Sequence, residues 1–156
     1  MIALKSCCFT GHRTIPDRHA DSIIEQLELI IEQLIKRGIT DFYCGGAVGF
    51  DTIAAIILIK YKTMYPQVRL ILALSCENQD KDFSPSEKAV YNFTKSEADE
   101  IIYTEEKYCK GCMYKRDRYL VDNSDICVCY LKKRYGGTAY TVRYALQSKK
   151  KMIYVK

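Results

Sequence analysis

Short apolar runs along this chain alternate with longer stretches in which apolar side chains recur every three or four residues. In the first such stretch, apolar residues at 23, 24, 27, 30, 31, 34 and 35 predict an amphipathic helix that lies after Asp17 and ends at Gly38. The segment Val68–Leu74 is apolar almost throughout, as expected of a strand that is covered on both faces. Ser84, Pro85 and Glu87 form a capping-box pattern with proline at the first helical position, which predicts a helix that runs to about Lys95. The full pattern predicts strands at Ile2–Phe9, Asp41–Cys44, Val68–Leu74, Glu100–Tyr103, Asp125–Leu131 and Met152–Val155, and further helices at Phe50–Tyr61, Met113–Asn123 and Thr138–Ser148.

This alternation predicts an α/β fold. A single Rossmann-like domain should span residues 1–156, with a mostly parallel sheet of about six strands and helices on both faces, in three layers. A chain of 156 residues is long enough for one such core. Sheets of this kind bind ligands at the carboxyl ends of their strands, so the loops after the strands are the candidate site.

Composition and charge narrow the possible cellular location and binding partners of the protein. The longest nearly uninterrupted apolar stretch, Ile53–Ile59, is far shorter than a membrane span, and the N-terminus lacks the features of a signal peptide, so we expect a cytoplasmic protein without membrane contact. The net charge of +5 is modest, and we interpret the lysines at 149–151 and 156 as a solvated helix end rather than a nucleic-acid patch. The eight cysteines are expected to be free thiols.

Two cysteine pairs raise the question of a metal. Cys109 and Cys112 have the spacing of half a zinc site or of a redox motif. We expect no metal site, on the expectation that Cys127 and Cys129 point to opposite faces of their strand. A redox role is disfavoured because Cys109 and Cys112 do not open a helix after the first strand.

The loop after the second predicted strand contains Gly45, Gly46 and Gly49, followed by Asp51. Glycines here let backbone amides approach a phosphate beside a helix N-terminus, although they could equally serve only a tight turn. Asp51 could cap the helix or accept a hydrogen bond from a ligand hydroxyl, and a capping role predicts an ionised carboxylate with a low pKa. The dinucleotide fingerprint does not fit, because its first glycine would fall on Cys44, so ordinary NAD-dehydrogenase binding is disfavoured.

The loops after the first and fifth strands also carry candidate chemistry. Gly11, His12 and Arg13 follow the first strand, and the Arg13 guanidinium could hold a phosphate through paired hydrogen bonds. His12 has no visible partner for a catalytic triad and is expected to be a polar loop residue. The remaining candidates are Gly136, Gly137 and Thr138 at the start of the last helix, and Arg116 and Asp117 in the helix before the fifth strand.

These motifs together resemble the YpsA-like branch of the SLOG superfamily, whose wider relatives include DprA and the LOG proteins. The resemblance covers nearly the whole chain and rests on Phe9 to Arg13, residues 45–51, Gln79, Arg116 to Asp125, and Gly136 to Thr138. It implies a Rossmann-like fold and a pocket for a nucleotide or nucleotide-derived ligand, in proteins proposed as ligand sensors. By this resemblance Gly11, Arg13, Gly45, Gly46, Gly49, Asp51, Gly136 and Thr138 line the pocket. Asp117 stands where the family usually has Asn, and Ser75 and Cys76 replace a Pro-aromatic pair.

Three functions fit these observations. The favoured one is a non-catalytic binder of a nucleotide-like ligand, which could alter contact with a protein partner or a second copy of the chain. The second is a LOG-like phosphoribohydrolase, but that mechanism uses a Glu shortly after a Gly-Thr pair, and here Gly137 and Thr138 are followed by Ala139, Tyr140 and Thr141. Asp117 stays the candidate base if it turns inward. The third is DprA-like binding of single-stranded DNA, which the net charge and the 13 tyrosines favour weakly.

Overall fold

The computed structural model describes residues 4–156 as six strands and five helices. The elements are β1 (Ser6–Gly11), α1 (Asp17–Lys36), β2 (Asp41–Cys44), α2 (Phe50–Lys62), β3 (Arg69–Leu74), α3 (Pro85–Glu97), β4 (Glu100–Tyr103), α4 (Cys112–Asp122), β5 (Ile126–Tyr130), α5 (Gly137–Gln147) and β6 (Lys151–Tyr154). The strands form one sheet in the order β4-β3-β2-β1-β5-β6, and every neighbouring pair is parallel. The predicted α/β, Rossmann-like class is confirmed.

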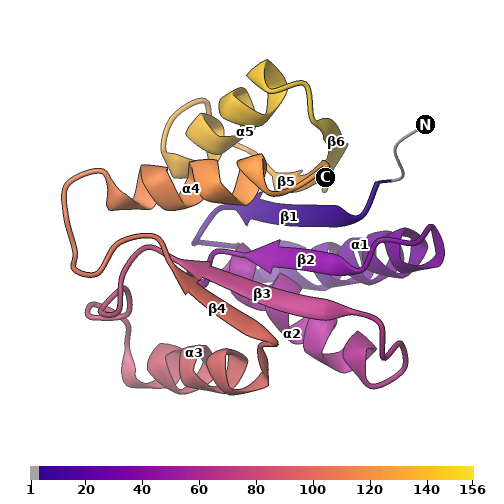
Figure 1. Ribbon diagram of the computed structural model, residues 1–156, viewed down its shortest axis with the longest axis horizontal. Coiled ribbons are helices and arrows are strands. Elements are labelled where there is room, and N and C mark those ends of the chain that lie inside the picture. Colours follow the sequence, from indigo (N-terminus) through magenta and orange to yellow (C-terminus); the bar gives the residue numbers. More distant parts are fainter. Residues whose placement is uncertain (1–3) are drawn as a thin grey trace.

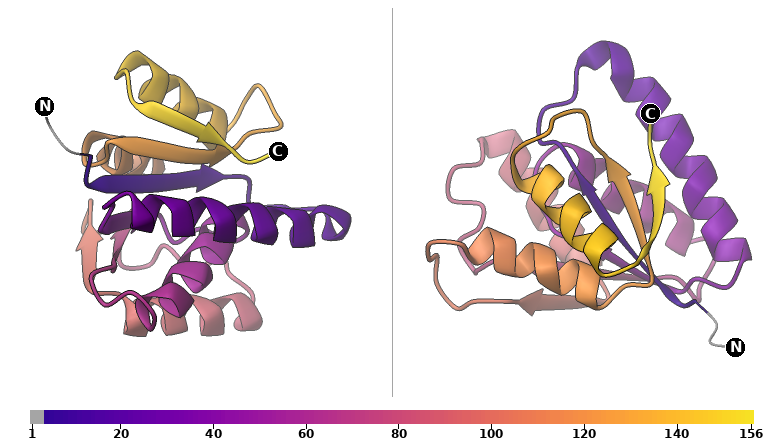
Figure 2. Two further views of the ribbon diagram at one scale, coloured as in Figure 1. Left: turned by 90° about the vertical axis from the view of Figure 1, so that its right-hand side faces the viewer. Right: turned by 90° about the horizontal axis from the view of Figure 1, so that it is seen from above.

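Helices cover both faces of the sheet. Figures 1 and 2 show α1, α2 and α3 on one face and α4 with α5 on the other. Each strand contributes to both sides, because successive side chains in a strand point to opposite faces. Phe9, Phe42 and Val128 therefore pack in the core beneath α1 and α2, whereas Cys8 and Cys127 pack beneath α4 and α5. The strand order reverses between β1 and β5, which places the loops after these two strands side by side.

Most predicted elements lie where expected, and the largest difference is in the first strand. It covers Ser6–Gly11 rather than Ile2–Phe9, and Ile2 lies outside the described residues. Thr10 and Gly11 stay in the strand because they pair with Cys129 and Tyr130 of β5. Tertiary pairing thus extends the strand beyond its apolar run. The helices α4 and α5 each begin one residue earlier than predicted.

The capping box at the start of α3 is confirmed. The Ser84 hydroxyl accepts a hydrogen bond from the backbone amide of Glu87 at 3.2 Å, and the Glu87 carboxylate accepts one from the Ser84 amide at 2.8 Å. Pro85 occupies the first helical position, and the helix continues to Glu97. The local sequence is therefore enough to place this helix start.

The expectation for the cysteines of β5 is wrong in one respect. Cys127 and Cys129 are two residues apart, so they point to the same face of the strand, where both pack with Cys8 beneath α4 and α5. Cys109 is exposed in the loop before α4 and Cys112 is buried at the start of that helix. All eight cysteines are free thiols, and residues 4–156 contain no cluster of three or more side chains suited to a metal ion.

Within the described part of the chain, no helix combines the length and the apolar character that crossing a membrane requires.

Candidate functional site

A cavity of about 430 Å³ lies at the carboxyl ends of β1 and β5, where the strand order reverses. Its walls come from the loops after β1 and β5, from the start of α2 and from α4. Of the predicted site residues, the cavity is lined by Gly11, His12, Arg13, Asp51, Arg116, Asp117, Gly136, Gly137 and Thr138. Segments that are more than a hundred residues apart in the sequence thus meet around one space.

Gly11 and His12 hold two of these loops together. A Cβ atom on Gly11 would overlap the ring of Phe50, so only glycine lets β1 pass this close to α2. The His12 Nε2 atom accepts a hydrogen bond of 2.8 Å from the backbone amide of Lys132, in the loop after β5. Burial lowers the pKa of His12, and the nearby charge of Lys133 lowers it further. His12 is therefore a neutral imidazole that joins the loops after β1 and β5.

Arg13 lies at the mouth of the cavity. Its side chain is exposed and makes no ion pair with any residue in the range 4–156. An exposed guanidinium without an ion-pair partner can bind an anion through paired hydrogen bonds. Arg13 is therefore the residue of this loop best suited to a phosphate.

Gly45, Gly46 and Gly49 do not line the cavity. Gly46 and Gly49 adopt φ values of +73° and +80°, in the region that favours glycine. A side chain on Gly46 would meet Leu74, and one on Gly49 would overlap the backbone of Arg13. The carbonyl of Gly45 accepts hydrogen bonds from Arg116 and Gln79. These glycines shape a tight turn that packs against its neighbours, and Ala47 is the residue of this turn that reaches the cavity.

We expect Gly49→Ala to lower the free energy of unfolding by about 2 to 3 kcal/mol, because it adds left-handed strain to an overlap with the Arg13 carbonyl. Gly38→Ala is the matched control: its φ is +100° but nothing lies within 4 Å of the added atom, so only strain of about 1 to 2 kcal/mol remains. Urea denaturation of both variants measures the difference. Equal losses would show that the close approach of the two loops does not matter for stability.

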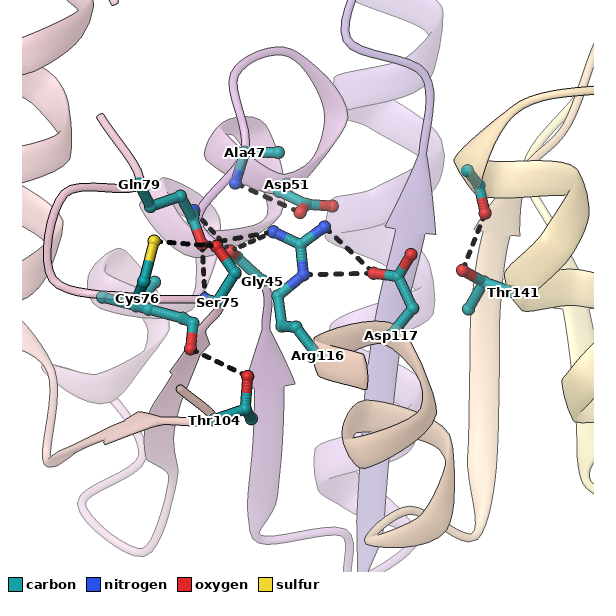
Figure 3. A network of polar contacts seen from close by, with 12 residues as sticks. Gly45, Ala47, Asp51, Ser75, Cys76, Gln79, Thr104, Arg116, Asp117 and Thr141 are labelled. Carbon is teal, nitrogen blue, oxygen red and sulfur yellow. Dashed lines mark hydrogen bonds and ion pairs between the residues drawn. The ribbon is translucent and has the colours of Figure 1, made fainter. Parts of the chain in front are cut away.

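A buried polar network joins Arg116 and Asp117, which line the cavity, to the ends of β2 and β3 (Figure 3). The guanidinium of Arg116 donates to Asp117 Oδ1 from Nε at 3.1 Å and from Nη2 at 2.9 Å, and Nη1 donates to the Gly45 carbonyl at 3.0 Å. Gln79 links the same carbonyl to Ser75, whose amide and hydroxyl both donate to Gln79 Oε1. Arg116 and Asp117 are each only 6% exposed. This network fixes the ends of β2 and β3 relative to α4.

Asp51 differs from its expected role. The N-cap of α2 is Gly49, and Asp51 lies inside the first turn, where its Oδ2 accepts a hydrogen bond from the Ala47 amide at 3.3 Å. Burial raises the pKa of Asp51 to about 7 and the charge of Asp117 adds to the rise, against the opposing effects of Arg116, the Ala47 amide and Arg13. The expectation of a low pKa is wrong, because loss of hydration outweighs the helix N-terminus at this depth. Asp51 is poised to exchange a proton near neutral pH.

The start of α5 presents an anion-binding geometry. Gly136 has a φ of +93° and leads into the helix, whose first amides have no partner within the helix and no side-chain cap. The Thr141 hydroxyl donates to the Gly137 carbonyl at 2.8 Å, so that hydroxyl is used inside the helix. The partial positive charge of the helix N-terminus at Gly137 and Thr138 faces the cavity that Arg13 also lines.

Several cavity residues were not among the sequence candidates. Tyr135 is 73% exposed, Tyr114 is 45% exposed, and both line the cavity with Lys133 and Tyr108. A large apolar side chain that is left exposed beside a polar cavity favours a stacking role. Tyr135 precedes the Gly-Gly turn directly in the sequence, whereas Tyr108 and Tyr114 reach the same cavity only in the folded structure.

Comparisons with known proteins agree with this architecture. Residues 8–155 match the family described as the YspA SLOG family, YpsA. The uncharacterized SPbeta prophage-derived protein YoqJ of Bacillus subtilis is 31% identical over 134 aligned residues, which cover 78% of each protein.

Two solved structures share the fold. DNA processing protein A from Helicobacter pylori, which was studied for its single-stranded DNA binding mode, has a TM-score of 0.69 with 19% identity and is matched over 97% of this chain. DprA from Streptococcus pneumoniae has a TM-score of 0.69 with 14% identity over 97% of this chain. The chain spans 65% and 50% of these two proteins respectively, so both proteins extend beyond the part that shares its fold. On the match over residues 8–155 and the similarity to YoqJ, the chain belongs to the YpsA SLOG family.

Proposed function

We propose that the cavity binds a nucleotide or a nucleotide-derived ligand and that the chain acts as a sensor of this ligand without converting it. The observation that carries the proposal is the position of the Arg13 guanidinium, which makes no ion pair within residues 4–156, at the same cavity as the N-terminus of α5. These two groups suit one phosphate. Tyr108, Tyr114 and Tyr135 supply aromatic surface on which a base can stack. A volume of about 430 Å³ lies within the range of small-ligand pockets.

A thermal-shift screen of nucleoside mono- and diphosphates, NAD, ADP-ribose and cyclic nucleotides tests this proposal. A ligand at 100 times its Kd adds about 2.7 kcal/mol of stability, which is a readily measured rise in Tm. No shift with any phosphate-bearing nucleotide would contradict the proposal.

Arg13→Ala should weaken the binding of a phosphorylated ligand by about 1.5 to 3 kcal/mol, the range for hydrogen bonds to charged groups. The Tm without ligand should stay nearly unchanged, because Arg13 is exposed and makes no ion pair within residues 4–156. Titration calorimetry measures the affinity, and the exposed Arg37, at the end of α1, supplies the matched variant Arg37→Ala. Unchanged affinity in Arg13→Ala would remove this residue from the site.

We expect no release of base or ribose phosphate from AMP, GMP or CMP at an enzymatic rate. The start of α5 carries no carboxylate, since Thr138 is followed by Ala139 and Tyr140. Asp117 lines the cavity, but its Oδ1 already accepts two hydrogen bonds from Arg116. Chromatography of incubated nucleotides measures the product. Turnover that disappears in Asp117→Asn or Asp51→Asn would replace the binder proposal with a hydrolase.

A further inference from the structure

A second cavity of about 340 Å³ lies against the first, between α4 and the start of α5. It is lined by Tyr114, Arg118, Arg134, Tyr135, Gly136, Tyr140 and Arg143. Tyr114, Tyr135 and Gly136 also line the first cavity. The two spaces therefore share a wall at these three residues.

The charge of this second cavity is positive. Three of its lining residues are arginines, and none of the residues from 4 to 156 that line it carries a carboxylate. Arg118 donates from Nη1 to the Tyr140 hydroxyl at 2.7 Å, and Arg143 donates from Nη1 to the Arg134 carbonyl at 3.4 Å. Neither of these bonds neutralises a guanidinium, so the arginines keep their charge for an anion.

The acidic group whose charge acts on Arg118 already accepts a hydrogen bond. Asp122, one turn beyond Arg118 on α4, accepts a hydrogen bond from the Tyr144 hydroxyl at 2.7 Å. It lies outside the cavity lining, although its charge acts on Arg118. The positive groups therefore outnumber the acidic ones around this space.

Three tyrosines, Tyr114, Tyr135 and Tyr140, line the same cavity. The rings of Tyr114 and Tyr140 meet edge to face at 4.7 Å between centroids, and Tyr140 and Tyr144 are stacked at 6.5 Å. Rings held in this way offer rigid surface to a planar base, and arginine guanidinium groups can stack on such a base as well. Aromatic surface combined with unneutralised arginines matches a nucleoside with its phosphate.

We infer that this cavity is a subsite for a second nucleotide unit, and that the preferred ligand of the chain is a dinucleotide in which two nucleosides are joined through phosphates. The inference rests on the proposed function, because the first nucleotide unit occupies the first cavity. The shared wall at Tyr135 and Gly136 is where the linking phosphates pass, close to the N-terminus of α5.

Titration calorimetry at fixed salt tests the inference with AMP, ADP and diadenosine diphosphate, and with the matching guanine series. The dinucleotide should bind about tenfold more tightly than the mononucleotide and more tightly than the nucleoside diphosphate, which adds a phosphate without a second base. Arg143→Gln should remove about tenfold of the dinucleotide affinity and leave the mononucleotide affinity unchanged. Arg37→Gln, which changes an exposed arginine at the end of α1, should alter neither.

The outcomes separate the subsite from the first cavity. Mononucleotide binding with no gain for the dinucleotide, or a gain that ADP reproduces in full, overturns the subsite and leaves the proposed function intact. Binding of no nucleotide overturns both. Oligothymidylate that binds more tightly than any dinucleotide and loses affinity in Arg143→Gln overturns the dinucleotide in favour of single-stranded DNA, whose binding would weaken steeply with salt.

Discussion

Replacing Arg116 with methionine is expected to lower the free energy of unfolding by about 3 to 5 kcal/mol. Arg116 is 6% exposed and lies beside Asp117, with which its guanidinium forms the ion pair at 2.9 Å, and its charge also acts on Asp51. Methionine fills much of the same volume but leaves the Asp117 carboxylate buried without its counter-charge. It also removes one of the donors to the Gly45 carbonyl. The cost therefore comes from an uncompensated charge more than from lost packing.

The neighbouring residue on α4 provides the control. Lys115 forms an ion pair with Glu105 in which both side chains are partly exposed, so Lys115→Met should cost no more than about 1 kcal/mol. The two variants are compared by urea denaturation at pH 7.5. The double variant Arg116→Met with Asp117→Leu should recover part of the loss, because it removes both members of the pair. Equal stability of Arg116→Met and Lys115→Met would contradict a structural role for the buried pair.

The sequence was sufficient for the fold where local rules decide the structure. The periodicity of α1 identified the side that is buried, since Ile23, Leu27 and Ile31 are all fully covered. The capping box placed the start of α3 because its two hydrogen bonds join residues only three apart. The end of β1 was missed because Gly11 belongs to the strand only through its pairing with β5, more than a hundred residues away.

The candidate site was predictable in part. The position of the loops after parallel strands was enough to expect Gly11, Gly46 and Gly137 around one cleft. Gly11 and Gly137 line the cavity, whereas Gly46 does not. From the sequence alone, the glycines after β2 could either contact a phosphate or serve only a tight turn. The structure places Gly46 and Gly49 against Leu74 and the Arg13 backbone, contacts that no local pattern encodes.

The pKa of Asp51 was the property of the site that the sequence predicted least well. The position of Asp51 at the start of a helix suggested an ionised carboxylate, whereas its pKa depends on its burial and on the nearby charges of Arg116 and Asp117. Both quantities arise only when β1, β2 and α4 have come together. The residues next to Asp51 in the sequence cannot predict its pKa, because Arg116 and Asp117 lie more than sixty residues away.

The buried Asp51 should make the stability of the protein fall as the pH rises from about 4 to 7. Its pKa is about 7 in the folded chain, against an ordinary value of 3.8. In this range the folded protein therefore holds a proton that the unfolded chain has released, so a rise in pH favours unfolding. A difference of about three units corresponds to about 4 kcal/mol, fully lost above pH 7.

Asp51→Asn isolates this contribution, because an asparagine can still accept the hydrogen bond from the Ala47 amide but carries no titrating proton. Between pH 4 and pH 8 the wild type should lose about 4 kcal/mol relative to the variant, since every other titrating group is common to both proteins. Urea denaturation across this range gives the two curves, and Asp21→Asn, at an exposed position on α1, should run parallel to the wild type. If the stability of Asp51→Asn changes with pH in the same way as that of the wild type, Asp51 titrates in the folded protein as it does in the unfolded chain. In that case Asp51 adds a negative charge to the cavity at neutral pH, and a phosphate would have to bind against that charge with Arg13 as the opposing cation.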